Sequence, residues 1–87
     1  MYIIAVYDIN EKRVVNILKI FRKYLTWIQK SVFEGELTEG QFAQLKAELK
    51  KKMNSEEDSV IFFSTSHSKW IDKEVLGLEK NPTNNIL

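Results

Sequence analysis

The chain has 87 residues, which is enough for one small domain and too few for two. It contains no cysteine, so disulfides and thiolate metal sites are excluded, and oligomerisation is the obvious further source of stability for a domain this small. The formal charge of +1 means that any nucleic-acid-binding surface must be local. The short apolar start lacks the basic leader and cleavage site of a signal peptide, and no apolar run approaches a membrane span, so we expect a cytoplasmic protein.

The first two predicted elements are a strand and an amphipathic helix. Residues 2–7 form a continuous apolar run that ends at Asp8, which is too short for a helix and typical of a strand covered on both faces. Asn10 is placed to cap a helix over roughly 11–25. Apolar residues recur along one side of this helix at helical spacing: Val14, Ile17, Leu18, Phe21 and Leu25.

The rest of the chain predicts extended segments around a second helix. Residues 26–37 suit extended structure, and Thr38 with Gln41 forms a capping box that begins the second helix. Residues 60–63 read as an apolar strand, and 70–76 as a further strand.

This order of elements predicts two helices on one face of a sheet. The other face would then be open to solvent, yet the strands over 2–7 and 60–63 are apolar at consecutive positions, so both of their faces need cover. We therefore expect the open face to meet another protein, and a two-fold homodimer is the commonest arrangement that supplies one.

Few side chains could carry chemistry. The only histidine, His67, stands between serines in a predicted loop, where a solvated side chain is commoner than a catalytic one. The acidic run 56–58 could bind a cation, but a solvated turn between helix and strand is the favoured interpretation. The three glycines stand apart, so the chain has no phosphate-binding loop.

Asp8 is the exception, because it ends an apolar strand at the edge where open sheets often place functional groups. The structural alternative is that it helps to cap the helix that follows. One carboxylate holds a metal poorly, but a two-fold axis supplies two, and Mg²⁺ commonly uses one or two carboxylates and keeps several waters. Two copies of Asp8 facing across a dimer therefore predict a minimal metal site, which would activate water and offset the charge of a scissile phosphate.

Basic and aromatic residues are candidates for nucleic-acid contact. Arg13 lies close to Asp8 in the sequence, and its guanidinium could hold a phosphate with two hydrogen bonds. A solvated helix face is the alternative for the basic residues, and we favour it for two of them, Lys19 and Lys23. The remaining basic candidates are Lys12, Arg22 and Lys30. Three aromatic residues could stack on bases, although packing in the core or in a dimer is favoured for each: Tyr7, Trp27 and Phe33.

Two motifs carry a family resemblance. The first strand ends in Val6-Tyr7-Asp8-Ile9 with an arginine at position 13, and Gln29-x-Ser31-Val32-Phe33-Glu34-Gly35 precedes the second helix. With both motifs, the chain resembles the CRISPR-associated Cas2 proteins over roughly residues 2–77.

The resemblance implies an α+β fold, ferredoxin-like βαββαβ with an additional C-terminal strand that pairs across a homodimer formed through the sheet face. It implies a domain over 1–77 and a tail over 78–87. Residues 26–37 would then supply two short strands or one sharply bent strand.

The resemblance also implies roles for particular residues. Asp8 matches the family's metal-binding and catalytic aspartate, and Arg13 matches its basic residue at the start of the first helix. Tyr7, Ser31 and Phe33 match further motif positions. Many members carry a second acidic residue where this chain has Asn10, so a mechanism that needs two carboxylates per chain does not fit.

Two related functions follow from the resemblance. One is a Mg²⁺-dependent endonuclease acting on RNA or double-stranded DNA. The other, which we favour as the biological role, is a dimeric scaffold for CRISPR spacer acquisition that binds nucleic acid and bridges the Cas1 integrase. An unrelated alternative is a ferredoxin-like regulatory dimer that binds a small ligand, against which the lack of a polar pocket motif argues.

Overall fold

The computed structural model describes residues 1–67 and 71–81. Within them the chain forms two helices and four strands in the order βαββαβ, which confirms the predicted α+β, ferredoxin-like class. The elements are β1 (Tyr2–Asp8), α1 (Glu11–Tyr24), β2 (Thr26–Gln29), β3 (Val32–Glu36), α2 (Glu39–Lys52) and β4 (Ser59–Thr65).

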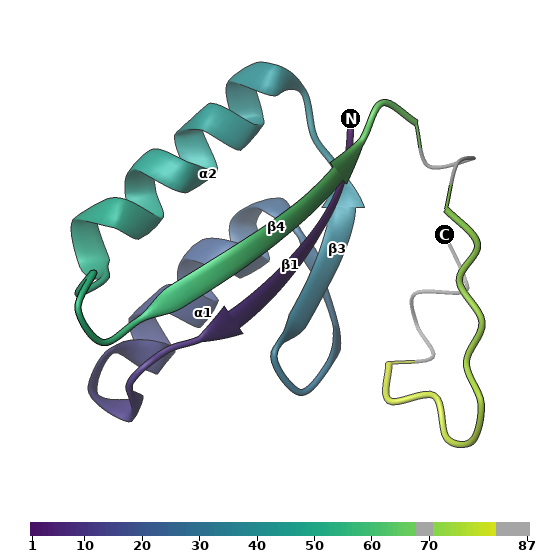
Figure 1. Ribbon diagram of the computed structural model, residues 1–87, viewed down its shortest axis with the longest axis horizontal. Coiled ribbons are helices and arrows are strands. Elements are labelled where there is room, and N and C mark those ends of the chain that lie inside the picture. Colours follow the sequence, from purple (N-terminus) through teal and green to yellow (C-terminus); the bar gives the residue numbers. More distant parts are fainter. Residues whose placement is uncertain (68–70, 82–87) are drawn as a thin grey trace.

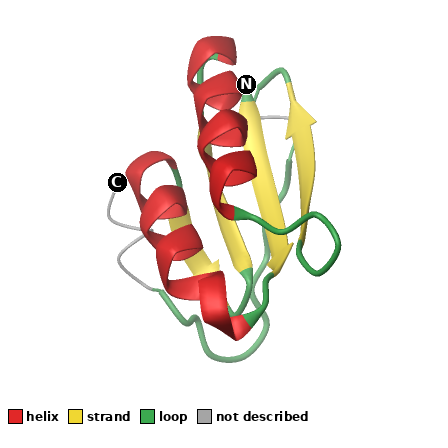
Figure 2. Cartoon of the chain, turned by 90° about the vertical axis from the view of Figure 1, so that its left-hand side faces the viewer, coloured by secondary structure: helices red, strands yellow, loops and turns green. Residues whose placement is uncertain are grey.

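The four strands form one antiparallel sheet in the order β2-β3-β1-β4, so β1 lies inside the sheet and β4 forms an edge (Figure 1). Both helices pack on the same face of this sheet (Figure 2). The first strand is therefore covered by helices on one side only, as the predicted two-layer arrangement requires.

Residues 26–37 form two strands joined by a tight turn at Lys30 and Ser31. Lys30 has a φ of 42°, in the left-handed region. The turn is fixed by the Tyr7 amide, which donates to the Ser31 carbonyl at 3.0 Å, and by the indole of Trp27, which donates to the Lys30 carbonyl at 3.0 Å. Of the two arrangements that the family resemblance implies, the structure therefore has two short strands.

Both helices begin at the predicted caps. The Asn10 side chain accepts a hydrogen bond from the Lys12 amide at 2.9 Å, and Thr38 and Gln41 satisfy each other's backbone amides in a capping box. These local bonds confirm the two helix starts that the sequence predicts.

Stacked aromatic rings form the centre of the core between the helices and the sheet. The rings of Phe21 and Phe33 are stacked at 4.9 Å between centroids, and Tyr7 lies 5.7 Å from Phe21. Phe21 and Phe33 are fully buried, as are Ile17 of α1 and Leu45 of α2. One stack thus joins α1 to β1 and β3.

The face of the sheet away from the helices is apolar and largely uncovered in the single chain. The register places Ile4 opposite Phe63 and Val6 opposite Ile61, and the alternation of side chains along the strands puts all four on this face. Ile61 and Phe63 are 55% and 57% exposed. This confirms the predicted apolar character of both faces of β1 and β4. We call this surface the open face; it also includes Val32 of β3, the partner of Val6.

Residues 71–76 of the predicted strand over 70–76 have no strand pairing within the single chain, and pairing across a dimer stays a prediction. This segment is held to the sheet by side chains instead. Lys73 Nζ donates to Glu34 at 2.5 Å, and Asn81 Nδ2 donates to the Trp27 carbonyl at 2.6 Å. Val75 and Leu76 remain exposed. Position 70 and residues 82–87 of the predicted tail lie outside the described residues, and the division at residue 77 stays a prediction.

Among the described residues, neither helix has the length and apolar character needed to cross a membrane.

The aromatic stack gives a stability prediction. Phe21→Ala removes the ring that joins Tyr7 and Phe33, and the cavity that it leaves should lower the free energy of unfolding by about 3–5 kcal/mol. Val15→Ala is the matched control, since Val15 lies on the same helix but is 62% exposed, and it should change stability by less than about 0.5 kcal/mol. Urea unfolding of both variants measures this, and equal effects would contradict the assignment of the core.

Candidate functional site

Asp8 ends β1 as an exposed carboxylate at one end of the open face. It pairs with Ser59, the first residue of β4, and alternation along β1 puts it on the same face as Ile4 and Val6. Its side chain makes no hydrogen bond or ion pair with any other described residue. The structural alternative, in which Asp8 caps the helix, is not what the described residues show, because Asn10 is the cap.

The donor chemistry at Asp8 suits a hard cation that keeps most of its waters. A free carboxylate oxygen is a ligand that Mg²⁺ prefers, and Mg²⁺ needs only one or two of them from the protein. No group of three or more potential ligands occurs among the described residues, so the described part of one chain does not build a closed metal cage. Asp8 thus fits the metal only if a second carboxylate comes from another molecule or if nucleic acid supplies further oxygens.

Arg13 is held by two acidic residues of its own chain. Its Nε donates to Asp58 Oδ2 at 2.6 Å, and its Nη2 donates to Glu57 Oε1 at 2.6 Å and to Asp58 Oδ1 at 3.1 Å. A phosphate would have to displace these carboxylates to bind the same nitrogens. The geometry therefore favours a structural role for Arg13 over the phosphate contact that the sequence suggested.

Asp58 is buried, which corrects the interpretation of 56–58 as a solvated turn for this residue, whereas Glu56 and Glu57 are exposed in the turn as expected. Its side chain has no exposed surface and accepts hydrogen bonds from the amides of Asn10 and Asn54 at 2.8 and 2.9 Å, besides those from Arg13. A polar residue directly before an apolar strand was the one signal in the sequence, but its partners lie up to 48 residues away. Local reasoning could not find them.

These bonds control the charge of Asp58. Hydrogen bonds from the Arg13 guanidinium, with those from the Asn10 and Asn54 amides, hold the pKa of the Asp58 carboxyl well below its usual range, against the opposing effect of burial. The hydrogen bonds from Arg13 to Asp58 and to Glu57 raise the pKa of the Arg13 guanidinium. Both groups are therefore charged at neutral pH.

Two of the other basic candidates lie near Asp8. Lys12 is exposed in the first turn of α1, and Lys30 is exposed in the β2–β3 turn, whose Lys30 carbonyl accepts a bond from the Tyr7 hydroxyl at 3.3 Å. Arg22 is exposed in the last turn of α1. At 1.5 Å per residue it lies about 15 Å along the helix from Lys12. The sequence candidates therefore do not form one cluster.

The aromatic motif residues are structural in the folded chain. Phe33 is fully buried and Tyr7 packs against it, so stacking of Phe33 on a base is incompatible with this fold. Ser31 contributes its carbonyl to the Tyr7 amide. The burial of Phe33 and the packing of Tyr7 agree with the favoured packing interpretation. The bond to Ser31 helps to fix the turn beside the end of β1.

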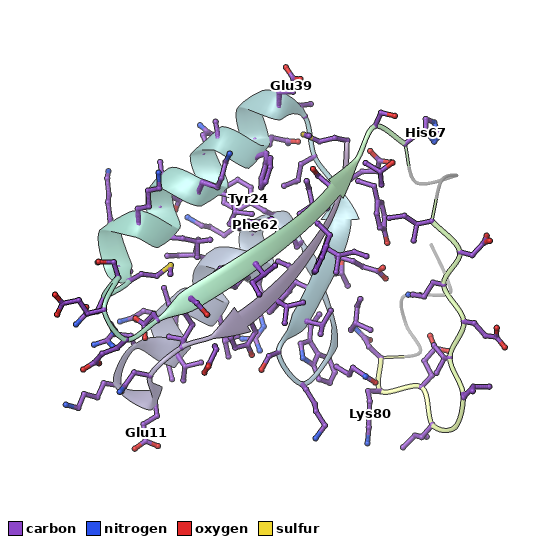
Figure 3. The ribbon with its side chains drawn as sticks, viewed as in Figure 1. Glu11, Tyr24, Glu39, Phe62, His67 and Lys80 are labelled. Atoms are coloured by element: carbon purple, nitrogen blue, oxygen red, sulfur yellow. The ribbon has the colours of Figure 1, made fainter. Side chains whose placement is uncertain are left out.

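His67 lies at the far end of β4 from the Asp8 site. Figure 3 shows Glu11, which marks the start of α1, and His67 at opposite ends of the molecule. His67 is exposed in the loop after β4, as expected. It cannot act together with Asp8 of the same chain.

The geometry defines a ferredoxin-like α+β domain with an exposed carboxylate at the end of its first strand and an apolar sheet face beside it. A family model described as "CRISPR associated protein Cas2" matches residues 1–73. The chain belongs to this Cas2 family, which confirms the resemblance seen in the sequence.

Named relatives and solved structures agree with this. The chain is 49% identical over its full length to the full length of a protein from Dictyoglomus turgidum, and 52% identical to one from Thermotoga maritima, with 92% of each chain covered. Both relatives are named "CRISPR-associated endoribonuclease Cas2". A structure titled "Crystal structure of cas2" matches with a TM-score of 0.86 at 43% identity, covering 94% of this chain and 92% of the other. Streptococcus pyogenes Cas2 matches with a TM-score of 0.73 at 27% identity, covering 88% of this chain and all of that one.

The buried carboxylate predicts a pH dependence of stability. Because the pKa of Asp58 is lower in the folded than in the unfolded chain, its ionised form stabilises the fold above pH about 4 and this contribution is lost as the pH falls below that value. Asp58→Asn should therefore be much less stable than the wild type at pH 7, and the difference should shrink between pH about 4 and 2. Urea unfolding across this range measures it.

Glu57→Gln is the matched control, since it removes the other carboxylate on Arg13, which is 49% exposed. It should cost less than about 1 kcal/mol at pH 7. A constant difference between the wild type and Asp58→Asn at every pH would contradict the assignment.

Proposed function

We propose that this chain is the dimeric scaffold of CRISPR spacer acquisition, which binds nucleic acid and bridges the Cas1 integrase in the cytoplasm. We further propose that the dimer has Mg²⁺-dependent endonuclease activity on RNA or DNA. The single observation that carries the proposal is the position of Asp8, an exposed carboxylate beside the apolar open face of a Cas2 fold.

The open face supports the homodimer. Burying a side chain such as Ile61 or Phe63 contributes about 1.5–3 kcal/mol, and the face carries several apolar side chains together. A two-fold contact through this face would cover them and bring two copies of Asp8 to the same interface. The exposed Val75 and Leu76 fit the exchanged C-terminal strand that the family implies, since the single chain gives them no strand partner.

The catalytic proposal assigns roles to few residues. Asp8 of each chain would bind the cation, and Lys12 and Lys30 would lie near the nucleic-acid backbone on either side of it. When bound, Mg²⁺ lowers the pKa of a coordinated water and offsets the negative charge that develops on the phosphate. Arg22 would contact the backbone further along α1, and Arg13 would hold the loop rather than a phosphate.

Names of relatives support the activity. The two relatives, which match over 100% and 92% of the chain, are named endoribonucleases, and this favours RNA as the substrate to test first. The scaffold role rests on membership of the family. A small-ligand regulatory dimer is less well supported, because the relatives are named endoribonucleases. The groove that could hold such a ligand lies between α2 and β4 and is lined by Lys46, Leu49, Lys50, Met53, Val60 and Phe62.

The assembly is tested first. Sedimentation equilibrium at micromolar concentration should give twice the 10.2 kDa chain mass. Ile61→Glu with Phe63→Glu places charge on the open face and should shift the mass toward the monomer, whereas Val15→Glu, at an exposed apolar position on α1, should leave the dimer intact. A wild-type monomer at this concentration would refute the dimer.

The activity is tested at Asp8. Asp8→Asn keeps the shape of the side chain but removes the charge that the cation needs, and cleavage of RNA or DNA should fall by at least about 100-fold. Integration of spacer DNA by the complex with Cas1 should survive, because docking and backbone contacts do not use this carboxylate. Cleavage at the wild-type rate would mean that another site or a contaminant is responsible, and lost integration in an intact dimer would mean that the scaffold also needs Asp8.

A further inference from the structure

A buried carboxylate joins the four chain segments that meet beside Asp8. Asp58 precedes β4, and its oxygens accept bonds from Arg13 in the first turn of α1, from the Asn10 amide in the β1–α1 loop and from the Asn54 amide after α2. None of its side-chain surface is exposed. A carboxylate buried away from water stays ionised only when hydrogen-bond donors or positive charges surround it.

Asp58 is connected to the backbone around Asp8 in two ways. Ser59, which follows Asp58 in the chain, pairs with Asp8 across the sheet. The amide of Asn10, two residues after Asp8, donates to Asp58 at 2.8 Å. The backbone at Asp8 is therefore held by Ser59 across the sheet and by Asp58 through the Asn10 amide.

The proposed metal site needs such a support. Each chain supplies one carboxylate, so the distance between the two copies of Asp8 decides whether both can reach one cation. The Asp8 side chain makes no hydrogen bond or ion pair with another described residue, so the position of its carboxylate depends on the backbone that carries it. Displacements of about 0.5 Å are enough to weaken such a site.

We propose that Asp58 is a positioning residue for Asp8, acting through the β1–α1 loop, and that Arg13 serves this loop by holding Asp58. The inference rests on the proposed function, in which Asp8 binds a divalent cation. Asp58 touches neither the cation nor the nucleic acid.

The experiment measures Mn²⁺ binding by calorimetry and RNA cleavage on intact dimers, at a temperature where every variant is folded. Asp58→Asn should weaken Mn²⁺ binding about 10- to 100-fold and lower kcat to a similar extent. The KM for RNA should stay within about threefold, because the basic residues that contact the backbone are unchanged.

Glu57→Gln is the matched control for this variant. It removes the neighbouring carboxylate on the same Arg13 but leaves the bond between Asp58 and the Asn10 amide in place. Mn²⁺ binding and kcat should both remain within about twofold of wild type. An equal loss in Glu57→Gln would mean that charge near Arg13, and not the loop, is responsible.

A second pair of variants tests the loop bond directly and covers the case in which Asp58→Asn fails to fold. Asn10 has a φ of −57°, which proline adopts without strain. Asn10→Pro and Asn10→Ala both lose the side-chain cap of α1, but only Asn10→Pro also loses the amide that donates to Asp58. Mn²⁺ binding should be at least about tenfold weaker in Asn10→Pro than in Asn10→Ala.

A third control separates positioning from general stability. Leu45→Ala opens a cavity in the core under α2, away from the loop. It should lower stability without changing Mn²⁺ affinity. An equal loss of Mn²⁺ affinity in Leu45→Ala would mean that any loss of stability weakens binding, and this would overturn the proposal.

The remaining outcomes separate a failure of the positioning role from a failure of the proposed catalytic function. If wild-type protein binds Mn²⁺ and cleaves RNA, and both Asp58→Asn and Asn10→Pro match their controls, the positioning role is wrong while the proposed function stands. If the wild-type dimer neither binds Mn²⁺ nor cleaves, the proposed catalytic function is wrong and the positioning role falls with it.

Discussion

Both helices pack on one face of the four-stranded sheet, and this one-sided cover leaves the opposite face of the sheet open. Strands of an antiparallel sheet with one face open to solvent would ordinarily alternate apolar and polar side chains. Here β1 and β4 are apolar on both faces, so Ile61 and Phe63 stay more than half exposed in the single chain. The fold therefore offers an interface of the kind that a second copy covers, and it places Asp8 at the end of that interface.

A second constraint is the buried carboxylate of Asp58, which pairs with Arg13 close to Asp8. Burying the carboxylate of Asp58 would be costly without partners, and the chain supplies a guanidinium and two amides. These partners come from the β1–α1 loop, from α1 and from the end of α2. The contacts of Asp58 thus connect the β1–α1 loop, α1 and the segment after α2 to the start of β4.

The aromatic stack and the contacts of Asp58 both hold the end of β1. Tyr7 packs its ring against Phe21 on the helix side, and its amide and hydroxyl fix the β2–β3 turn at Ser31 and Lys30. Its neighbour Asp8 faces the opposite way, toward the open face. Adjacent residues of one strand therefore serve the core and the candidate site, because successive side chains in a strand point to opposite faces.

The sequence by itself determined the features that depend on neighbouring residues. Helix starts at Asn10 and Thr38 follow from capping patterns, and the apolar runs of β1 and β4 follow from composition over a few positions. The exposed position of Asp8 at a strand end was predictable for the same reason. Only the tertiary structure decided what Arg13 and Asp58 do, since they lie 45 residues apart and pair only when β4 comes to rest beside β1. It also decided that residues 71–76 form no strand within one chain, because a strand exists only where another strand supplies its hydrogen bonds, and no such partner lies beside this segment in the described chain.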